Sequence, residues 1–157
     1  MALEIERKFL VTGSFEQDAF KSIRITQGYI SLDPERIVRI RRTDDKAYLT
    51  IKSMAGKSGI TRFEWEKEIS PEDADMLLKL CVQGVIDKTR FFVDIENKTF
   101  EVDVFHGDNE GLIIAEIELN SESENFPKPA WLGEEVSFDE RYYNSYLVKH
   151  PYKFWIK

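Results

Sequence analysis

The sequence predicts a mainly β (α+β) protein in which about eight antiparallel strands carry a few helices outside the sheet. Apolar and polar residues alternate with a period of two along most of the chain, and short turn signals separate the alternating segments. Only two segments show helical spacing. Strands with a single apolar face are typical of antiparallel sheets, because the strands of parallel sheets are usually buried on both faces.

The first strand places Glu4, Glu6 and Lys8 on one face and Ile5 and Phe9 on the other. Successive side chains of a strand point to opposite faces, so each such segment has one charged side. The same alternation predicts strands at 24–32, 38–41, 48–52, 62–69, 88–90, 100–104 and 115–119.

Turn residues punctuate these strands at intervals that suit hairpins. Short connections are predicted at Asp33-Pro34, 43–45, Glu96-Asn97 and 106–109. Residues 54–59 form a longer predicted loop, and 122–129 form a polar linker that contains proline.

Helix signals occur twice. Ser70 is a predicted N-cap, Pro71 occupies the first helical position, and apolar residues at helical spacing follow until Gly84. A second helix is predicted to begin near Asn144 and to end before Pro151.

Length and composition indicate one ordinary globular domain over residues 1–157. The net charge of −7 argues against a nucleic-acid partner, and no segment has the length of a membrane span. Charged residues interrupt the N-terminus before a signal peptide could form, and Cys81 is the one cysteine, so we expect a cytoplasmic protein. We expect a monomer or a homodimer.

Alternation by itself allows two packings of the charged faces. In a sandwich they point to water, which is the usual arrangement. In a closed barrel they line the interior, and eight strands leave room for one small ligand. The sorting of charges by strand favours the barrel: Glu4/Glu6 and Glu116/Glu118 are acidic, whereas Arg39/Arg41 and Lys88/Arg90 are basic. Buried charges at this density are costly unless they bind ligands or metals.

An ordered series of charged motifs runs through most of the chain. It opens with the ExExK sequence Glu4-Ile5-Glu6-Arg7-Lys8. The later members are Arg39-x-Arg41, Lys52, Arg62-x-Glu64-x-Glu66, Lys88-x-Arg90, Asp103, Glu116-x-Glu118 and the closing run from Glu135 to Asn144. This ordered series resembles the CYTH superfamily, the triphosphate tunnel metalloenzymes.

This resemblance implies an eight-stranded antiparallel closed barrel or tunnel, a triphosphate bound inside it, and Mg²⁺ or Mn²⁺ held by glutamates. The short form, with Gln27-Gly28-Tyr29, is most similar to the small bacterial tripolyphosphatase branch. In that branch a lysine–tyrosine pair is thought to position or activate water, so the resemblance implies Lys88 and Tyr29 as the catalytic pair.

Residue chemistry suggests roles for the remaining charges. Arginine binds phosphate bidentately and lysine acts as a point charge, so we expect a substrate cradle of cations. Mg²⁺ and Mn²⁺ prefer oxygen ligands. The predicted substrate-binding residues are Lys8, Arg39, Arg41, Lys52, Arg62 and Arg90. The predicted metal ligands are Glu4, Glu6, Glu116 and Glu118, and possible supporting residues are Glu64, Glu66 and Asp103.

Several functions stay open at this point. The leading prediction is a metal-dependent phosphoanhydride hydrolase acting on inorganic tripolyphosphate, and the enzymatic alternatives are a thiamine triphosphatase and a class IV-like adenylyl cyclase. The non-enzymatic alternative is a polyphosphate- or nucleotide-binding module, which would gain nothing from the acidic pairs. No Gly-rich phosphate loop, nucleophile elbow or CxxC motif is present.

Overall fold

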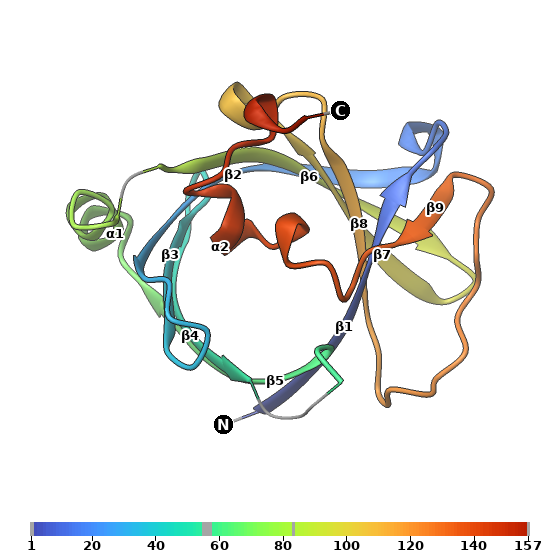
Figure 1. Cartoon of the computed structure of the whole chain (residues 1–157), viewed down its shortest axis with the longest axis horizontal. Coiled ribbons are helices and arrows are strands. Elements are labelled where there is room, and N and C mark those ends of the chain that lie inside the picture. The colour runs from blue at the N-terminus through green and yellow to red at the C-terminus, as the bar shows by residue number, and fades with distance from the viewer. Residues whose placement is uncertain (1, 55–57, 83, 157) are drawn as a thin grey trace.

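The computed structural model describes residues 2–54, 58–82 and 84–156, and a ring of antiparallel strands dominates it. Figure 1 looks through this ring. The predicted mainly β class is confirmed. The strands in the described residues are β1 (Ala2–Val11), β2 (Ala19–Ser31), β3 (Ile37–Arg42), β4 (Ala47–Met54), β5 (Thr61–Ile69), β6 (Ile86–Ile95), β7 (Lys98–Phe105), β8 (Ile113–Glu118) and β9 (Leu132–Glu135).

The ring closes because β1 pairs with two strands that are far from each other in the sequence. The spatial order is β5-β4-β3-β2-β6-β7-β8-β1, and an additional pairing joins β1 to β5. The N-terminal part of β1 pairs with β5, where Ala2 lies opposite Glu64. Its later part pairs with β8, where Lys8 lies opposite Glu116. β9 lies outside this ring and pairs with the end of β1.

Turn chemistry accounts for the hairpin between β6 and β7. Glu96 and Asn97 have positive φ angles of 48° and 71°. Two left-handed residues in succession are typical of a type I′ turn, whose twist matches that of the flanking strands. The turn predicted at these two residues is therefore confirmed.

Helix α1 (Pro71–Leu78) covers the outer surface of β3 and β4. The Ser70 side chain accepts a hydrogen bond from the backbone N–H of Asp73, as the capping signal predicts. Ala74 packs with Ile40 and Ala47 in a small core beneath the helix. Cys81, just after the helix, packs against this core and is half-buried.

A larger core fills the other outer side of the ring. Phe15 and Trp131, which lie in the segments before β2 and before β9, pack edge to face. They cover Phe100, Val102 and other apolar residues on the outward face of β7 and its neighbours. The barrel therefore has an apolar exterior beneath its covering segments.

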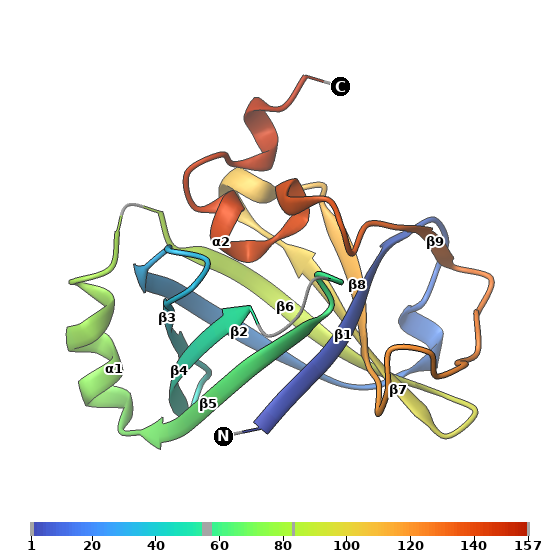
Figure 2. The same cartoon turned by 60° about the horizontal axis from the view of Figure 1, so that its bottom comes forward.

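Helix α2 (Asn144–Leu147) is shorter than predicted and lies over one end of the barrel, as Figures 1 and 2 show. Leu147 and Val148 pack there against apolar residues at the end of the interior, including Ile37 and Phe105. Residues 55–57 of the predicted 54–59 loop lie outside the described residues. In the part of the chain that the structure describes, no helix is long and apolar enough to cross a membrane.

Candidate active site

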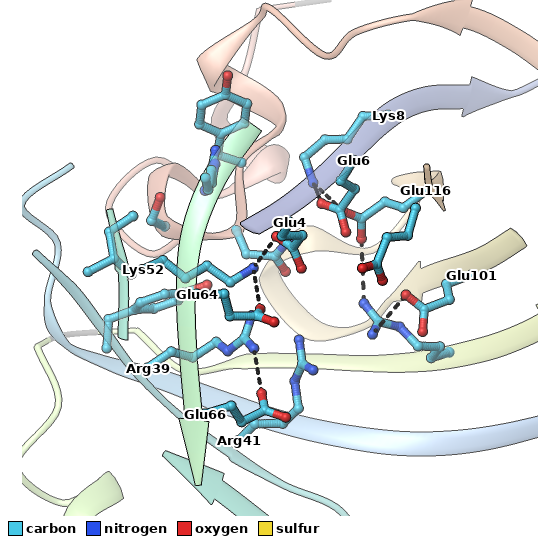
Figure 3. A pocket seen from close by; sticks show the side chains of 18 of the residues that line it. Glu4, Glu6, Lys8, Arg39, Arg41, Lys52, Glu64, Glu66, Glu101 and Glu116 are labelled. Atoms are coloured by element: carbon cyan, nitrogen blue, oxygen red, sulfur yellow. Dashed lines mark hydrogen bonds and ion pairs between the residues drawn. The ribbon is translucent and has the colours of Figure 1, made fainter. Parts of the chain in front are cut away.

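The interior of the ring holds a cavity of about 190 Å³ whose wall is mostly charged. Each strand sends alternate residues inward, so the polar strand faces meet in this space and the sandwich alternative is excluded. Figure 3 shows carboxylates, lysines and arginines that point toward one another from different strands. The lining residues are Glu4, Glu6, Lys8, Tyr29, Ile37, Arg39, Arg41, Lys52, Arg62, Glu64, Glu66, Lys88, Arg90, Glu101, Glu116, Glu118, Tyr143, Asn144 and Ser145.

The structure brings the sequence-predicted site residues together around this one cavity. Every residue predicted for catalysis, substrate binding or metal binding lines it, and so do the supporting residues Glu64 and Glu66. Asp103, the third supporting residue, is buried and ion-paired to two of the lining cations, Lys88 and Arg90. Arg42, the neighbour of Arg41 along β3, turns outward and pairs with Asp75 of α1.

Two arginines on β3, Arg39 and Arg41, are only weakly neutralised by their neighbours. Arg39 Nη2 donates to Thr50 Oγ1 at 3.3 Å and lies 3.7 Å from a carboxylate oxygen of Glu66. The buried Nε–H of Arg39 has no hydrogen-bond partner among the described residues. Burial and the nearby Arg39 and Arg90 lower the pKa of Arg41 to about 10. Crowded guanidinium groups with an unused donor favour the binding of a multivalent anion.

Lys88 on β6 is enclosed next to these arginines. Its Nζ lies 2.8 Å from Oδ2 of Asp103 and 3.0 Å from Oδ1 of Asn144, a residue of α2. Burial lowers the pKa of Lys88 to about 7; Asp103 opposes this shift, and Arg90 and Arg41 add to it. An amine with a pKa near neutrality can accept or release a proton at physiological pH.

Asp103 neutralises two buried cations at once. Arg90 binds it through two parallel bonds, Nε to Oδ1 at 2.7 Å and Nη2 to Oδ2 at 2.9 Å. The second cation is Lys88. Burial raises the pKa of Asp103, but Arg90 and Lys88 outweigh it and hold this pKa below its usual value. The carboxylate therefore stays charged and holds Arg90 and Lys88 in place.

Glu6 and Glu116 form a pair of facing carboxyl groups. They come from neighbouring strands, β1 and β8, and share a hydrogen bond. Burial and the charge of Glu116 raise the pKa of Glu6 well above its usual value. Burial would also raise the pKa of Glu116. The positive charges of Lys8 and Arg90 and the hydrogen bond from Glu6 outweigh this effect and hold the pKa of Glu116 well below its usual value. Lys8 Nζ lies 2.5 Å from Glu116 Oε2.

A second carboxyl pair, Glu4 and Glu64, lies across the β1–β5 seam. Lys52 Nζ lies 2.9 Å from Glu4 Oε1 and 3.4 Å from Glu64 Oε2. Burial raises the pKa of Glu4, but Lys52 and the hydrogen bond from Glu64 outweigh it, so this pKa is lowered. The pKa of Glu64 is raised by burial and by Glu4. The lysine is thus held by two acidic side chains that border the cavity.

Glu118 is exposed at the border of the cavity and Arg62 is half-buried there. The pKa of Glu118 is raised by burial and by the charges of Glu4 and Glu101. The Arg62 guanidinium carbon lies 5.0 Å from the centre of the Tyr143 ring. Among the described residues, neither Glu118 nor Arg62 makes the kind of tight ion pair that holds Lys8 and Lys52.

Tyr29 reaches the cavity from β2, the strand next to the one that carries Lys88. Its side chain is buried, and its hydroxyl oxygen accepts a hydrogen bond of 3.0 Å from Nε2 of Gln27. The tyrosine and the lysine of the predicted catalytic pair therefore border the same enclosed volume.

The acidic pairs fit an oxygen-preferring divalent cation. Each pair presents two carboxyl groups from different strands, and in the Glu6/Glu116 pair a shared proton relieves a repulsion that a cation would also relieve. Within the residues that the structure describes, no three acidic, histidine or cysteine side chains form a complete metal site. Mg²⁺ usually takes one or two carboxylates and completes its coordination with phosphate oxygens and water. The paired arrangement suits that mode.

Some lining or supporting residues were not assigned a role from the sequence. Gln27 lies on the inward face of β2 and donates a hydrogen bond to Tyr29. Thr50 lies on the inward face of β4 and accepts a hydrogen bond from Arg39. Gln27 could have been predicted from the sequence, because it lies two residues before Tyr29 and therefore on the same strand face. Asn144 belongs to the closing motif, but its contact with Lys88 depends on how α2 folds over the barrel end.

A second cavity of about 540 Å³ adjoins the charged one beside α2. The two cavities share Ile37, Lys52, Arg62, Tyr143 and Ser145. The wall of the second cavity also includes the exposed Phe138 and the stacked rings of Tyr146 and His150. It is therefore the more apolar of the two spaces.

Comparison with known proteins agrees with this arrangement. A family model described as the CYTH domain matches residues 2–146. An inorganic triphosphatase of Acetivibrio thermocellus is 48% identical over 98% of this chain and 97% of its own length. An inorganic triphosphatase of Nitrosomonas europaea is 34% identical over 92% of this chain and 96% of its own length. A crystal structure of an inorganic triphosphatase superposes with a TM-score of 0.67 at 32% identity, covering 94% of this chain and 95% of that chain.

Proposed function

Because the chain belongs to the CYTH domain family, we propose that it is an inorganic triphosphatase, a phosphoanhydride hydrolase whose substrate binds inside the barrel. The observation that carries this proposal is the cluster of Arg39, Arg41 and Lys88 in an enclosed cavity. The buried Nε–H of Arg39 has no partner among the residues that the structure describes, and the pKa values of Arg41 and Lys88 are lowered by burial and by neighbouring cations. A linear polyanion would supply the missing acceptors and the missing negative charge.

Binding is assigned to the cations that line the cavity. Arginine forks hold phosphate oxygens bidentately, whereas each lysine supplies a compact positive charge. Several of these cations already hold carboxylates, so they are fixed before the substrate arrives and lose little freedom when it binds. The proposed substrate-binding residues are Lys8, Arg39, Arg41, Lys52, Arg62 and Arg90.

The chemical step is assigned to Lys88 and Tyr29. Hydrolysis forms one phosphorus–oxygen bond from water and breaks the bond to a bridging oxygen, so the products are phosphate and pyrophosphate. The attacking water must lose a proton. With a pKa near 7, the Lys88 amine is able to take that proton, and Asp103 and Asn144 hold its nitrogen in place. The hydroxyl of Tyr29, which borders the same cavity, is assigned a contact with an oxygen of the reacting group or with the water.

The metal is assigned to the acidic side of the cavity. We propose Glu4, Glu6, Glu116 and Glu118 as the residues that hold Mg²⁺ or Mn²⁺. When bound, a divalent cation neutralises charge on the phosphate oxygens and acidifies or orients water. The described residues contribute the carboxylates for this site in cross-strand pairs, and Lys8 fixes the position of Glu116.

A substrate panel tests the proposed function. Phosphate release is measured with tripolyphosphate, thiamine triphosphate and ATP, each with Mg²⁺, with Mn²⁺ and with EDTA. Tripolyphosphate with metal is expected to give the highest kcat/KM. ATP belongs in the panel because the apolar second cavity adjoins the charged one, and cyclic AMP is measured in the same samples. Cyclic AMP formation would favour a cyclase, whereas tight binding without turnover would favour a binding module.

A further inference from the structure

Gln27 is a buried amide directly behind the wall of the charged cavity. It is 0% exposed, does not line the cavity, and lies on β2 two residues before Tyr29. Its side chain is hydrogen-bonded at both ends. Its Nε2 lies 3.0 Å from the hydroxyl oxygen of Tyr29, and its Oε1 lies 3.4 Å from Nε of Arg41.

The Arg41 contact determines which way round this amide lies. A guanidinium group only donates hydrogen bonds, so the atom that faces Arg41 has to be the carbonyl oxygen of Gln27. The opposite orientation would set two donors against each other in a buried place, where an unmet donor is costly. The NH2 group of Gln27 is therefore held toward Tyr29.

The amide orientation in turn determines the direction of the Tyr29 hydroxyl. An NH2 group can only donate, so the phenolic oxygen accepts from Gln27 and its own proton is directed elsewhere. Tyr29 borders the cavity, so that proton is available to an oxygen atom inside it. Arg41, Gln27 and Tyr29 thus form a chain of bonds in which every donor points the same way.

The backbone around the pair is held closely. A Cβ on Gly28, between Gln27 and Tyr29, would lie only 2.8 Å from Sγ of Cys81, so only glycine lets this strand approach the segment after α1. The backbone N–H of Val82 also donates to the carbonyl oxygen of Tyr29 at 2.8 Å. These contacts leave Gln27 and Tyr29 little freedom to move apart.

We propose that Gln27 is a positioning residue that makes the Tyr29 hydroxyl a hydrogen-bond donor toward the substrate. This inference rests on the proposed function, because it assigns Tyr29 a contact with the reacting triphosphate or its water. It also restricts that contact, since a hydroxyl held in this way donates and does not accept a proton from water. Proton removal is then left to Lys88.

Two substitutions at the same position test the direction of the bond. Gln27→Met keeps the size and removes both hydrogen bonds. Gln27→Glu keeps the shape, but its carboxylate can only accept, so it draws the Tyr29 proton away from the cavity. Both variants are expected to lower kcat for tripolyphosphate by about tenfold, the usual consequence of losing one hydrogen bond. If Gln27 only filled space, Gln27→Glu, which keeps its shape, would keep the wild-type kcat.

A double-mutant cycle tests whether Gln27 acts through Tyr29. In a Tyr29→Phe background, Gln27→Met is expected to cause no further fall in kcat, because the hydroxyl it directs is already gone. The matched control is Asn109→Ala, which removes a buried amide that accepts from the Tyr152 backbone outside both cavities. It is expected to lower the melting temperature and leave kcat within about twofold. Wild-type kcat in Gln27→Glu, or independent losses in the cycle, would overturn the proposal.

A measurement that needs no activity separates this inference from the proposed function. The side-chain NH2 signals of Gln27 in a ¹H–¹⁵N spectrum are assigned by their absence from Gln27→Met, or from Gln27→Glu if the methionine variant does not fold. Tyr29→Phe is expected to shift one of these amide protons. An unchanged signal would show that the bond is absent and would reject the assignment. If the wild-type protein releases no phosphate, the proposed function is wrong, and this spectrum alone decides the role of Gln27.

Discussion

The ammonium nitrogen of Lys88 lies 2.8 Å from Oδ2 of Asp103, and both side chains are 1% exposed. Asp103 opposes the deprotonation of Lys88, yet burial and the nearby arginines lower the pKa of Lys88 to about 7. The same carboxylate holds Arg90 through two bonds. This buried pair therefore connects the stability of the barrel to the protonation of its proposed catalytic amine, and predictions follow for both.

The rate should depend on pH through Lys88. The amine is protonated below about pH 7 and neutral above it, so a base role predicts that kcat/KM for tripolyphosphate rises with pH through about 7. We use kcat/KM because it reports the groups of the free enzyme. Lys88→Arg, which stays protonated, should be slow and should lack this inflection. A rate that falls through the same range would mean that Lys88 serves as a fixed charge.

Breaking the buried pair should destabilise the protein. Asp103→Asn leaves Lys88 and Arg90 without their shared carboxylate, so we expect the free energy of unfolding to fall by about 3–5 kcal/mol. Urea unfolding measures this change, and Asp108→Asn is the control because its pair with Lys153 is exposed. The control is expected to change by at most about 1 kcal/mol. An equal loss of unfolding free energy in both variants would show that the buried Asp103 pair stabilises the protein no more than the exposed Asp108 pair.

Substitution of Arg39 and substitution of the proposed catalytic pair should affect different kinetic constants. If Arg39 binds the substrate as proposed, it contacts it in both the ground state and the transition state, so Arg39→Ala should mainly raise KM. Lys88→Ala and Tyr29→Phe should mainly lower kcat, by about tenfold or more. Steady-state titration with saturating metal measures both constants. Arg42→Ala is the control, because this arginine points outward to Asp75, and both constants should stay within about twofold.

One kinetic result would contradict the assignment of Lys88 and Tyr29 as the catalytic pair. If Lys88→Ala and Tyr29→Phe keep the wild-type kcat while only KM rises, the two residues bind substrate and do not act in the chemical step. The attacking water would then have to be activated by other groups in the cavity.

The metal requirement should depend on the facing glutamates. Chelation is expected to abolish activity, and Glu6→Gln or Glu116→Gln should raise the metal concentration for half-maximal activity by about ten- to a hundredfold. Glu135→Gln is the matched control, because Glu135 pairs with Arg7 and lines neither cavity. Activity measured across a metal titration gives the comparison. Identical curves for all three variants would reject the metal assignment.

Much of the fold and of the candidate site could be predicted from the sequence, because strand periodicity is a local property. Arg39 and Arg41 share one face wherever their strand lies, and the same holds for Glu116 and Glu118. Each residue predicted for catalysis, substrate binding or metal binding was found on the cavity wall for this reason. The cap at Ser70 and the turn at Glu96-Asn97 were also predictable, since each depends on residues that are close in the chain.

Other features depend on pairings between distant segments. The acidic pairs were expected along each strand, yet the close carboxyl contacts run across strands, between Glu6 and Glu116 and between Glu4 and Glu64. Their register is set by the seams that β1 forms with β8 and β5. The contact of Asn144 with Lys88 likewise requires α2 to fold over the barrel end.

By itself the sequence determined which residues alternate, which strands are acidic or basic, and where the chain turns, because backbone stereochemistry and side-chain solvation act over a few residues. Only the tertiary structure decided which face is inside. That choice is made when β1 pairs with β5 and closes the ring, and the alternation along each strand is by itself compatible with either face. Closure shields the charges from bulk water. Their pKa values therefore shift, and the hydrogen bonds of a buried amide such as Gln27 fix its orientation.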